Sequence, residues 1–285
     1  RLLRGAGCFT DDFNLTGQAH AYVLRSTHAH GIINSIDVAA ARVASGVLDV
    51  LTWTDLVEAG IGWLPCNNPA KNRDGSPMIK PPRPSLASAR VRHVGEAVAL
   101  IVAESAAAAR DASELIEVDI TALPSVTHFM DAIEPDAPQL HDEADKNIAL
   151  DWEFGDAEVV EQAFASAHHV TRLRLNSNRV VVNAMEPRAA VAQFEEGRYT
   201  LHVPTQGAFG FRNGLANNLM KVPVEQVRVR TYDVGGSFGM KSALYPEYAP
   251  LLLAAKRLGR AVKWCDERSA SFVSDQHGRD SEVMA

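Results

Sequence analysis

The stretch Val227-Arg-Val-Arg-Thr-Tyr-Asp-Val-Gly-Gly-Ser-Phe-Gly-Met-Lys-Ser-Ala-Leu-Tyr-Pro-Glu247 decides how this chain can fold. Residues 227–232 alternate apolar and polar side chains and include β-branched residues, a pattern that predicts a half-buried strand. Gly235, Gly236 and Gly239 then end the alternation. Because glycine has no Cβ, the backbone N–H groups of such a turn can approach a ligand closely.

Two interpretations of this glycine-rich turn stay open on the residues alone. A helix-compatible run from Tyr248 to Leu258 follows the turn, so the order is strand, glycines, helix. An anionic or oxo-bearing cofactor suits free N–H groups in that position. A tight turn that needs positive φ and binds nothing fits the same glycines equally well.

The bulk composition is that of an ordinary globular protein. The 285 residues are 46% hydrophobic and 22% charged, and this length accommodates two domains with separate cores. The net charge is −7, from 35 acidic and 28 basic residues, and no basic run offsets it. This balance argues against a nucleic-acid partner. No apolar stretch is long enough for a membrane span.

The three cysteines do not form a metal motif. Cys8, Cys66 and Cys265 are far apart, odd in number and without a C-x-x-C spacing, which excludes a zinc knuckle or an iron–sulfur cluster built from them. They predict reduced, mostly buried thiols and a cytoplasmic location. The chain begins at Arg1 without Met and ends at Ala285 within a strand-like run, so we expect it to be a piece of a longer polypeptide.

The order of patterns along the chain predicts an α+β fold with two domains. Residues 1–131 read as a β-rich first domain with two or three helices, residues 132–150 as a linker, and residues 151–285 as the start of a second domain. Within the first domain, strands at 19–26 and 31–38 are predicted to form a hairpin.

Further elements are predicted from the same periodicities. They are strands at 47–52, 91–102 (bulged or turned at Gly95), 118–121, 170–175, 180–194, 198–203 and 261–265, and helices capped by Thr54, Ser105 and Asp156 and at 211–220. The strand at 180–194 is predicted to form a hairpin with that at 198–203.

Few side chains outside the turn point to chemistry. Gln206 lies between a strand and a helix, where its amide can donate to an oxo or carbonyl group, although a solvated loop glutamine is the commoner outcome. Glu186 and Arg188 predict either a buried ion pair or the wall of a site. No histidine and acidic residue that could activate Ser237 as a nucleophile is evident in the sequence. His28 with His30 and His168 with His169 do not have the spacing of zinc ligands.

Two function classes follow from these residues. The unit from strand 227–232 to Asp266 superficially resembles a dinucleotide fingerprint, but its glycines are spaced G-G-x-x-G and only 19 residues (285 − 266) follow Asp266. The other class is a non-nucleotide cofactor held by loops from several strands, with a non-catalytic scaffold or assembly fragment as its alternative.

The turn also carries a family resemblance. Val234-Gly-Gly-Ser-Phe-Gly-Met-Lys resembles the large, molybdopterin-binding subunits of the xanthine dehydrogenase, aldehyde oxidase and aerobic carbon monoxide dehydrogenase family. Similar motifs occur in order along nearly the whole chain: Phe9-Thr-Asp-Asp, Gly17-Gln-Ala-His, Arg25-Ser-Thr-His-Ala-His, Val94-Gly-Glu-Ala-Val-Ala and Ala122-Leu-Pro-Ser-Val of a hammerhead domain, then Met185-Glu-Pro-Arg, Pro204-Thr-Gln-Gly, Tyr245-Pro-Glu, Arg260-Ala-Val-Lys-Trp and His277-Gly-Arg-Asp of a molybdenum domain.

The resemblance implies a site at the turn. Gln206 would approach the oxo ligand of molybdenum, and Phe238 would lie near the metal, neither being a direct ligand. The loop residues implied to contact the metal and the pterin are Gly235, Gly236, Ser237, Phe238 and Gly239. The cofactor would be molybdenum–molybdopterin or its cytosine dinucleotide form, and electrons would leave through 2Fe–2S clusters and FAD on other subunits or segments.

This sequence differs from the family pattern at two positions, and it does not contain the residue that serves as the catalytic base in the family. Ser237 stands where the family usually has a third glycine, so the geometry on the metal side is expected to differ. Ser242 stands where purine-oxidising relatives have glutamate, which weakens the resemblance to xanthine-oxidising enzymes. The motifs as a whole resemble the carbon monoxide dehydrogenase-like branch more than the purine oxidases. The family's catalytic base comes from sequence beyond Ala285. We therefore expect the 285 residues alone to be inactive and to retain no pterin. The remaining part of the molybdenum domain, a small-molecule substrate and an oligomeric parent protein are the implied partners.

Overall fold

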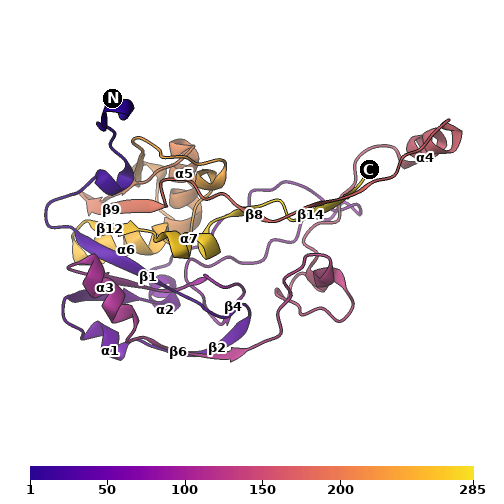
Figure 1. Cartoon of the computed structure of the whole chain (residues 1–285). Coiled ribbons are helices and arrows are strands. Elements are labelled where there is room, and N and C mark those ends of the chain that lie inside the picture. Colours follow the sequence, from indigo (N-terminus) through magenta and orange to yellow (C-terminus); the bar gives the residue numbers. More distant parts are fainter. The chain divides into compact units, whose positions relative to one another are not determined.

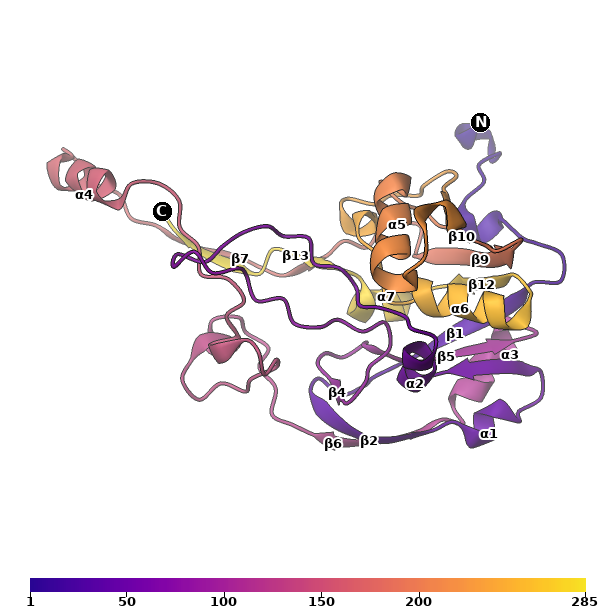
Figure 2. The same cartoon turned by 180° about the vertical axis from the view of Figure 1, so that it is seen from behind.

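The computed structural model describes residues 1–285, and these form two compact units that do not follow chain order (Figures 1 and 2). Unit 1 consists of Arg1–Pro65, Pro82–Pro124 and Val182–Gln276. Unit 2 consists of Cys66–Pro81, Ser125–Val181 and His277–Ala285.

Unit 1 is built on a seven-stranded mixed sheet in the order β11-β10-β9-β12-β1-β5-β3. β1 pairs with β12 in parallel and β10 with β11 in parallel, and the other neighbours are antiparallel. The predicted hairpin of β9 and β10 is confirmed. The strands are β1 (Ala19–Arg25), β3 (Val47–Leu51), β5 (Ala97–Ala103), β9 (Ala189–Glu195), β10 (Arg198–His202), β11 (Val227–Arg230) and β12 (Val262–Cys265).

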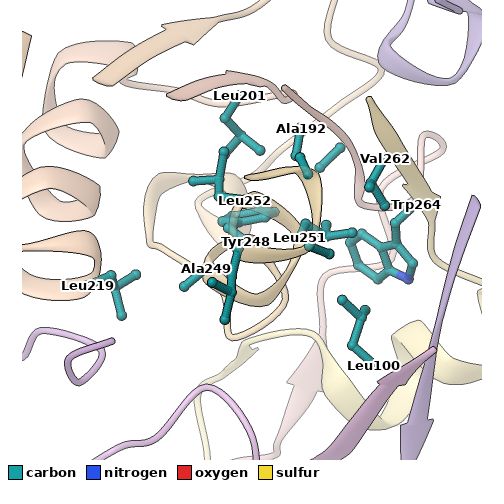
Figure 3. Packing of buried hydrophobic residues seen from close by; sticks show 14 of the residues in the cluster. Leu100, Ala192, Leu201, Leu219, Tyr248, Ala249, Leu251, Leu252, Val262 and Trp264 are labelled. Atoms are coloured by element: carbon teal, nitrogen blue, oxygen red, sulfur yellow. The ribbon is translucent and has the colours of Figure 1, made fainter. Parts of the chain in front are cut away.

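Helices bury both faces of this sheet. α6 (Tyr248–Leu258) is apolar over two turns, and its side chains pack among residues of the central strands (Figure 3). On the opposite face, α1 (Ala39–Arg42) and α3 (Ala106–Ser113) contribute small alanines that let the helices approach closely. β5 is consequently buried along its whole length, because Leu100 and Val102 face one core and Ala99 and Ile101 the other.

A second, three-stranded sheet in unit 1 contradicts the hairpin predicted for residues 19–38. β2 (Gly31–Asp37) pairs with β4 (Arg90–Val91) and β6 (Glu117–Ala122), whereas β1 pairs with β5 and β12. The prediction was wrong because the run at 97–103 offers β1 a partner that buries apolar side chains on both faces.

Several boundaries also differ from the sequence prediction. The strand expected at 180–194 is broken between β8 (Val180–Val181) and β9, where Pro187 lacks an N–H donor and Asn183 has a left-handed backbone. The interruption predicted at Gly95 within the strand at 91–102 is confirmed as a turn, which separates β4 from β5. α5 (Ala208–Gly214) starts before the predicted 211 and continues as a π-helical turn, Leu215–Met220.

The helix caps agree with the sequence in two of three cases. Ser105 and Asp156 accept the backbone N–H of Ala108 and Val159, as N-cap residues do. The third helix, α2 (Trp53–Glu58), is capped by Thr52 in a capping box with Asp55, not by Thr54. The last helix of unit 1 is α7 (Arg268–Ser274).

Unit 2 contains little regular structure. β7 (Arg174–Ser177) pairs with β14 (Ser281–Met284), and β8 pairs with β13 (His277–Gly278). α4 (Ala157–Ser166) has the predicted apolar face, but Val159, Val160 and Phe164 are 59%, 50% and 54% exposed. None of the helices is long and apolar enough to cross a membrane.

One buried arginine joins four elements of unit 1. The Arg188 guanidinium donates to Glu247 at 2.7 Å, to Asp266 at 2.9 Å and to Asp275 at 2.6 Å, and it lies 4.0 Å from the ring centroid of Tyr245. Glu247 and Asp266 also bind Arg25. Burial acts to raise the pKa of Glu247, but the two arginines outweigh it and hold that pKa below its usual value. The network therefore fixes the starts of β9 and α6 and the end of α7 against the end of β12.

Replacing Arg188 by Met leaves buried carboxylates without their partner and is expected to lower the free energy of unfolding by about 3–5 kcal/mol. Urea unfolding followed by circular dichroism measures this change. Arg198→Met, at an exposed arginine, is the matched control and should change stability by less than about 0.5 kcal/mol. Equal losses in the two variants would contradict the structural role of Arg188.

Candidate functional site

Lys241 connects the three segments that carry the predicted site residues. Its Nζ donates to the backbone oxygen of Glu186 at 2.9 Å and to the Glu186 carboxylate at 2.8 Å. Its backbone oxygen accepts from Gln206 N at 3.1 Å, and its backbone N–H donates to the Ser237 hydroxyl at 3.0 Å. Burial lowers the pKa of Lys241, and the hydrogen bond to Glu186 opposes that shift. One buried residue thus brings segments 184–188, 204–207 and 235–241 together.

The glycine loop, defined as residues 235–239, needs glycine at specific places. Gly236 and Gly239 have φ values of +99° and +97°, which glycine adopts without a steric penalty. A Cβ on Gly235 would lie 2.5 Å from the Cβ of Glu186, so this position is limited by close approach rather than by φ. Phe238 also has a positive φ of 49°, and its ring is 81% exposed. The loop therefore presents an aromatic ring outward from a backbone held at both ends.

The loop presents unused donors. Gly235 N donates to the Glu186 carboxylate at 2.7 Å, and Met240 N closes the turn onto Ser237 O at 3.0 Å. Residues 236–239 lie between these two donors, and none of their four backbone N–H groups donates to an acceptor within the protein. Successive free N–H groups form a concave donor surface suited to an anion or to acceptor atoms.

Gln206 lies next to this donor surface. Its side chain is exposed, and its Oε1 is 2.6 Å from the Ser237 hydroxyl. Thr205 holds the segment in place, since its hydroxyl donates to Lys241 O and accepts the N–H of Gly207. The structure thus brings together Gln206 and the whole glycine loop, the complete set of cofactor-contacting residues named from the sequence.

Glu186 and Arg188 do not pair with each other. Glu186 binds Lys241 and Gly235, whereas Arg188 binds the buried carboxylates described above. The buried ion pair, one of the two alternatives left open by the sequence, is therefore observed for both residues, with Lys241 as the partner of Glu186 and three carboxylates as the partners of Arg188. The role of Lys241 was not predicted, because its partners Gln206 and Glu186 are 35 and 55 residues away in the chain (241 − 206 and 241 − 186). The available signal in the sequence was the position of this lysine two residues after Gly239.

An aromatic stack adjoins the strand that leads into the loop. His202 stacks on Phe13 with ring centroids 4.3 Å apart, and its two ring nitrogens bond the Tyr232 hydroxyl and the Gln193 amide oxygen. Burial, followed by the charge of Arg230, lowers the pKa of His202 to about 4. A neutral histidine therefore fixes Tyr232, three residues before Gly235.

The cysteines and acidic groups show no metal cluster. No group of three or more His, Cys, Asp or Glu side chains is placed to hold a metal ion. All three cysteines are free, but the prediction of mostly buried thiols is wrong: Cys8 and Cys66 are partly exposed and Cys265 is exposed. Burial of the thiol group itself, followed by the negative charges of Asp11 and Asp266, raises the pKa of Cys265 to about 12.

The dinucleotide alternative does not fit the geometry. In a dinucleotide fold the glycine turn leads directly into a helix whose N-terminus holds the pyrophosphate. Here residues 240–247 separate the loop from α6, and Glu247 at the start of α6 is buried against arginines. β11 is an edge strand separated from β12 by β10 and β9, so β11, α6 and β12 do not form the compact βαβ unit that a dinucleotide fingerprint requires.

Comparison with protein families identifies the family of the chain and its fold. Residues 140–285, more than half of the chain, match the model of the molybdopterin cofactor-binding domain. Residues 4–124 match the aldehyde oxidase and xanthine dehydrogenase a/b hammerhead domain. The chain belongs to the xanthine dehydrogenase, aldehyde oxidase and carbon monoxide dehydrogenase family, which confirms the resemblance and the α+β fold class.

The chain is similar in sequence and in structure to individual members of this family. The chain is 33% identical to the nicotine 6-hydroxylase large subunit of Paenarthrobacter nicotinovorans, over 99% of this chain and 34% of the relative. Reconstituted CO dehydrogenase from Oligotropha carboxidovorans has a TM-score of 0.88 and 31% identity, over 98% of this chain and 35% of that one. Quinoline 2-oxidoreductase from Pseudomonas putida 86 has a TM-score of 0.83 and 33% identity, with coverages of 98% and 35%. The chain spans about a third of the length of the curated relatives it matches.

Gly235→Ala tests the close approach in the loop. The added Cβ meets Glu186 at 2.5 Å, so we expect overpacking to lower the free energy of unfolding by about 1–3 kcal/mol. Chemical unfolding provides the measurement. Gly210→Ala, in α5 with open space around its Cβ, is the control and should be neutral or slightly stabilising. A neutral Gly235→Ala would show that the loop does not press on Glu186.

His202 makes stability depend on pH in a defined window. The unfolded histidine takes up a proton as the pH falls below 6.5, whereas folded His202 stays neutral until about pH 4. Its contribution to stability is therefore complete above 6.5 and declines between 6.5 and 4. In urea titrations, the difference in the free energy of unfolding between wild type and His202→Gln should become smaller as the pH falls from 6.5 to 4. Gln226→Ala, at an exposed residue that does not titrate, is the control and should show no such trend. A His202 difference that stays constant with pH would refute the buried neutral state.

Proposed function

We propose that this chain forms part of the molybdenum-binding subunit of a molybdenum hydroxylase. The observation that supports this function is the joint presentation of Gln206 and the free N–H groups of residues 236–239, held by Lys241. All of these groups donate hydrogen bonds. A cofactor that presents acceptor oxygens and sulfurs, such as molybdenum with an oxo group and a pterin dithiolene, matches such a surface.

The roles of the residues follow from their geometry. The Gln206 amide would donate to the oxo side of the metal, and the glycine loop would lie against the metal and the pterin through its backbone. Phe238, exposed on the loop, would cover the metal without binding it. The bound cofactor supplies oxidation of a substrate carbon with water-derived oxygen. We assign no proton-abstracting base among these residues.

The substrate class is an aldehyde, an N-heterocycle or carbon monoxide. The relatives include a nicotine 6-hydroxylase large subunit, a quinoline 2-oxidoreductase and CO dehydrogenases. These support the class without selecting one member, because related folds accept different substrates through pocket shape. Ser242 in place of glutamate favours the carbon monoxide dehydrogenase-like branch over purine oxidation.

We further propose the organisation of the complete subunit. Residues 1–131 form the hammerhead domain, residues 132–150 a linker, and residues 151–285 the first portion of the molybdenum domain, whose remainder completes the pocket. Electrons would pass to 2Fe–2S clusters and FAD on other subunits or segments of a cytoplasmic, oligomeric enzyme. The pterin is molybdopterin or its cytosine dinucleotide form. The 285 residues alone should neither retain it nor turn over substrate.

The decisive measurement is the molybdenum and released-pterin content of the complete subunit that contains this chain, produced with its partners in a host that makes the cofactor. Stoichiometric metal is expected. Repeated absence of metal and pterin in the folded, assembled protein would instead support the alternative, a non-catalytic scaffold.

Gln206→Ala then tests the site in the loaded enzyme. Removing a donor aimed at a polarised oxygen is expected to lower kcat about 100-fold with metal content unchanged. Gln226→Ala, at an exposed glutamine outside the site, is the control and should leave kcat within about twofold. Equal kcat in Gln206→Ala and wild type would remove Gln206 from the proposed site.

A further inference from the structure

The bond between Ser237 and Gln206 joins two segments that are 31 residues apart. Ser237 stands where the family resemblance expects a glycine, so its hydroxyl is an addition to the loop. The Gln206 side chain is otherwise exposed, and its only hydrogen bond within the protein is the one to this hydroxyl. The orientation of the Gln206 amide therefore depends on Ser237.

The direction of this bond follows from the neighbours of the hydroxyl. Ser237 Oγ accepts the backbone N–H of Lys241 at 3.0 Å, a donor that cannot act as an acceptor. The single hydroxyl hydrogen is free to donate to Gln206. The separation of 2.6 Å is typical of an O–H···O bond and short for N–H···O. The partner is thus the amide oxygen, and the amide nitrogen of Gln206 faces away from Ser237.

The position of the hydroxyl is set by the backbone. Ser237 O accepts from Met240 N at 3.0 Å, which closes the turn around the residue. Gly236 on one side and Gly239 on the other have left-handed conformations that shape this turn. Lys241, which binds Ser237 Oγ, is buried and anchored on Glu186. The hydroxyl is therefore held before any ligand arrives.

We propose that Ser237 is a positioning residue that holds the amide nitrogen of Gln206 outward, so that the site recognises a hydrogen-bond acceptor and not a donor. This inference rests on the proposed function, in which the acceptor is an oxo group. A glutamine amide can rotate by half a turn and then present its oxygen, which would repel an acceptor. Loss of the hydroxyl removes the bond that separates these two orientations.

The test uses the complete enzyme with its partner subunits and the variants Ser237→Ala and Ser237→Thr. Ser237→Ala should keep its molybdenum content and lose threefold to tenfold in kcat, the effect of about one neutral hydrogen bond. Ser237→Thr keeps the hydroxyl and should restore kcat. In the double variant with Gln206→Ala, loss of Ser237 should cost nothing further, since it acts only through Gln206.

Atomic-resolution crystal structures provide a readout that needs no turnover. The Gln206 amide should have one orientation in wild type and two in Ser237→Ala. Ser242→Ala is the matched control, because Ser242 donates to Gly239 O and not to Gln206, and it should leave the amide unchanged.

The outcomes separate this inference from the proposed function. Additive losses in the double variant, or one unchanged amide orientation in Ser237→Ala, would overturn the role of Ser237 even in a fully loaded enzyme. Absence of molybdenum from wild type would defeat the proposed function instead. In that case the crystal structures of wild type and Ser237→Ala still decide whether Ser237 orients the amide.

Discussion

The structure of unit 1 depends on the ion pairs of Arg188. A fully buried guanidinium is costly to desolvate, and here three carboxylates and the face of Tyr245 surround it. Each carboxylate comes from a different part of the chain: the start of α6, the end of β12 and the end of α7. A hydrophobic residue would fill the same volume, but it would not require those ends to meet at one point. The network therefore determines how these chain segments are positioned, in addition to stabilising the fold.

The same short segment also supports the candidate site. Glu186 lies two residues before Arg188 and binds Lys241 and Gly235, while Arg188 binds the core. Pro187 between them restricts the backbone, so the two charged side chains are held in opposite networks. The glycine loop is therefore placed relative to the core through three residues. This arrangement explains how a loop with few apolar contacts keeps a defined conformation.

The elements that could be predicted from the sequence are those that depend on local patterns. The alternation in β11, the alanine-rich α3 and the caps Ser105 and Asp156 all depend on residues close to each other in the chain. The pairing of β1 does not depend on neighbouring residues. Its partner is β5, a distant strand that is buried on both faces, and not β2, the next strand in the chain. The grouping of Gln206 with the loop residues came from the family resemblance. The bonds of Lys241 that produce this grouping are long-range, and no periodicity reports them.

The central pairing of β1 with β12 has a consequence for synthesis on the ribosome. Ala19 pairs with Val262, a separation of 243 residues (262 − 19), and β12 also separates the strands of the hammerhead region from β9 and β10. At roughly 5–20 residues per second, β1 waits on the order of 10–50 seconds for this neighbour. One edge of the nascent hammerhead sheet is open during that time and can pair with other chains. The strand order thus leaves this edge available to other chains until β12 has been synthesised.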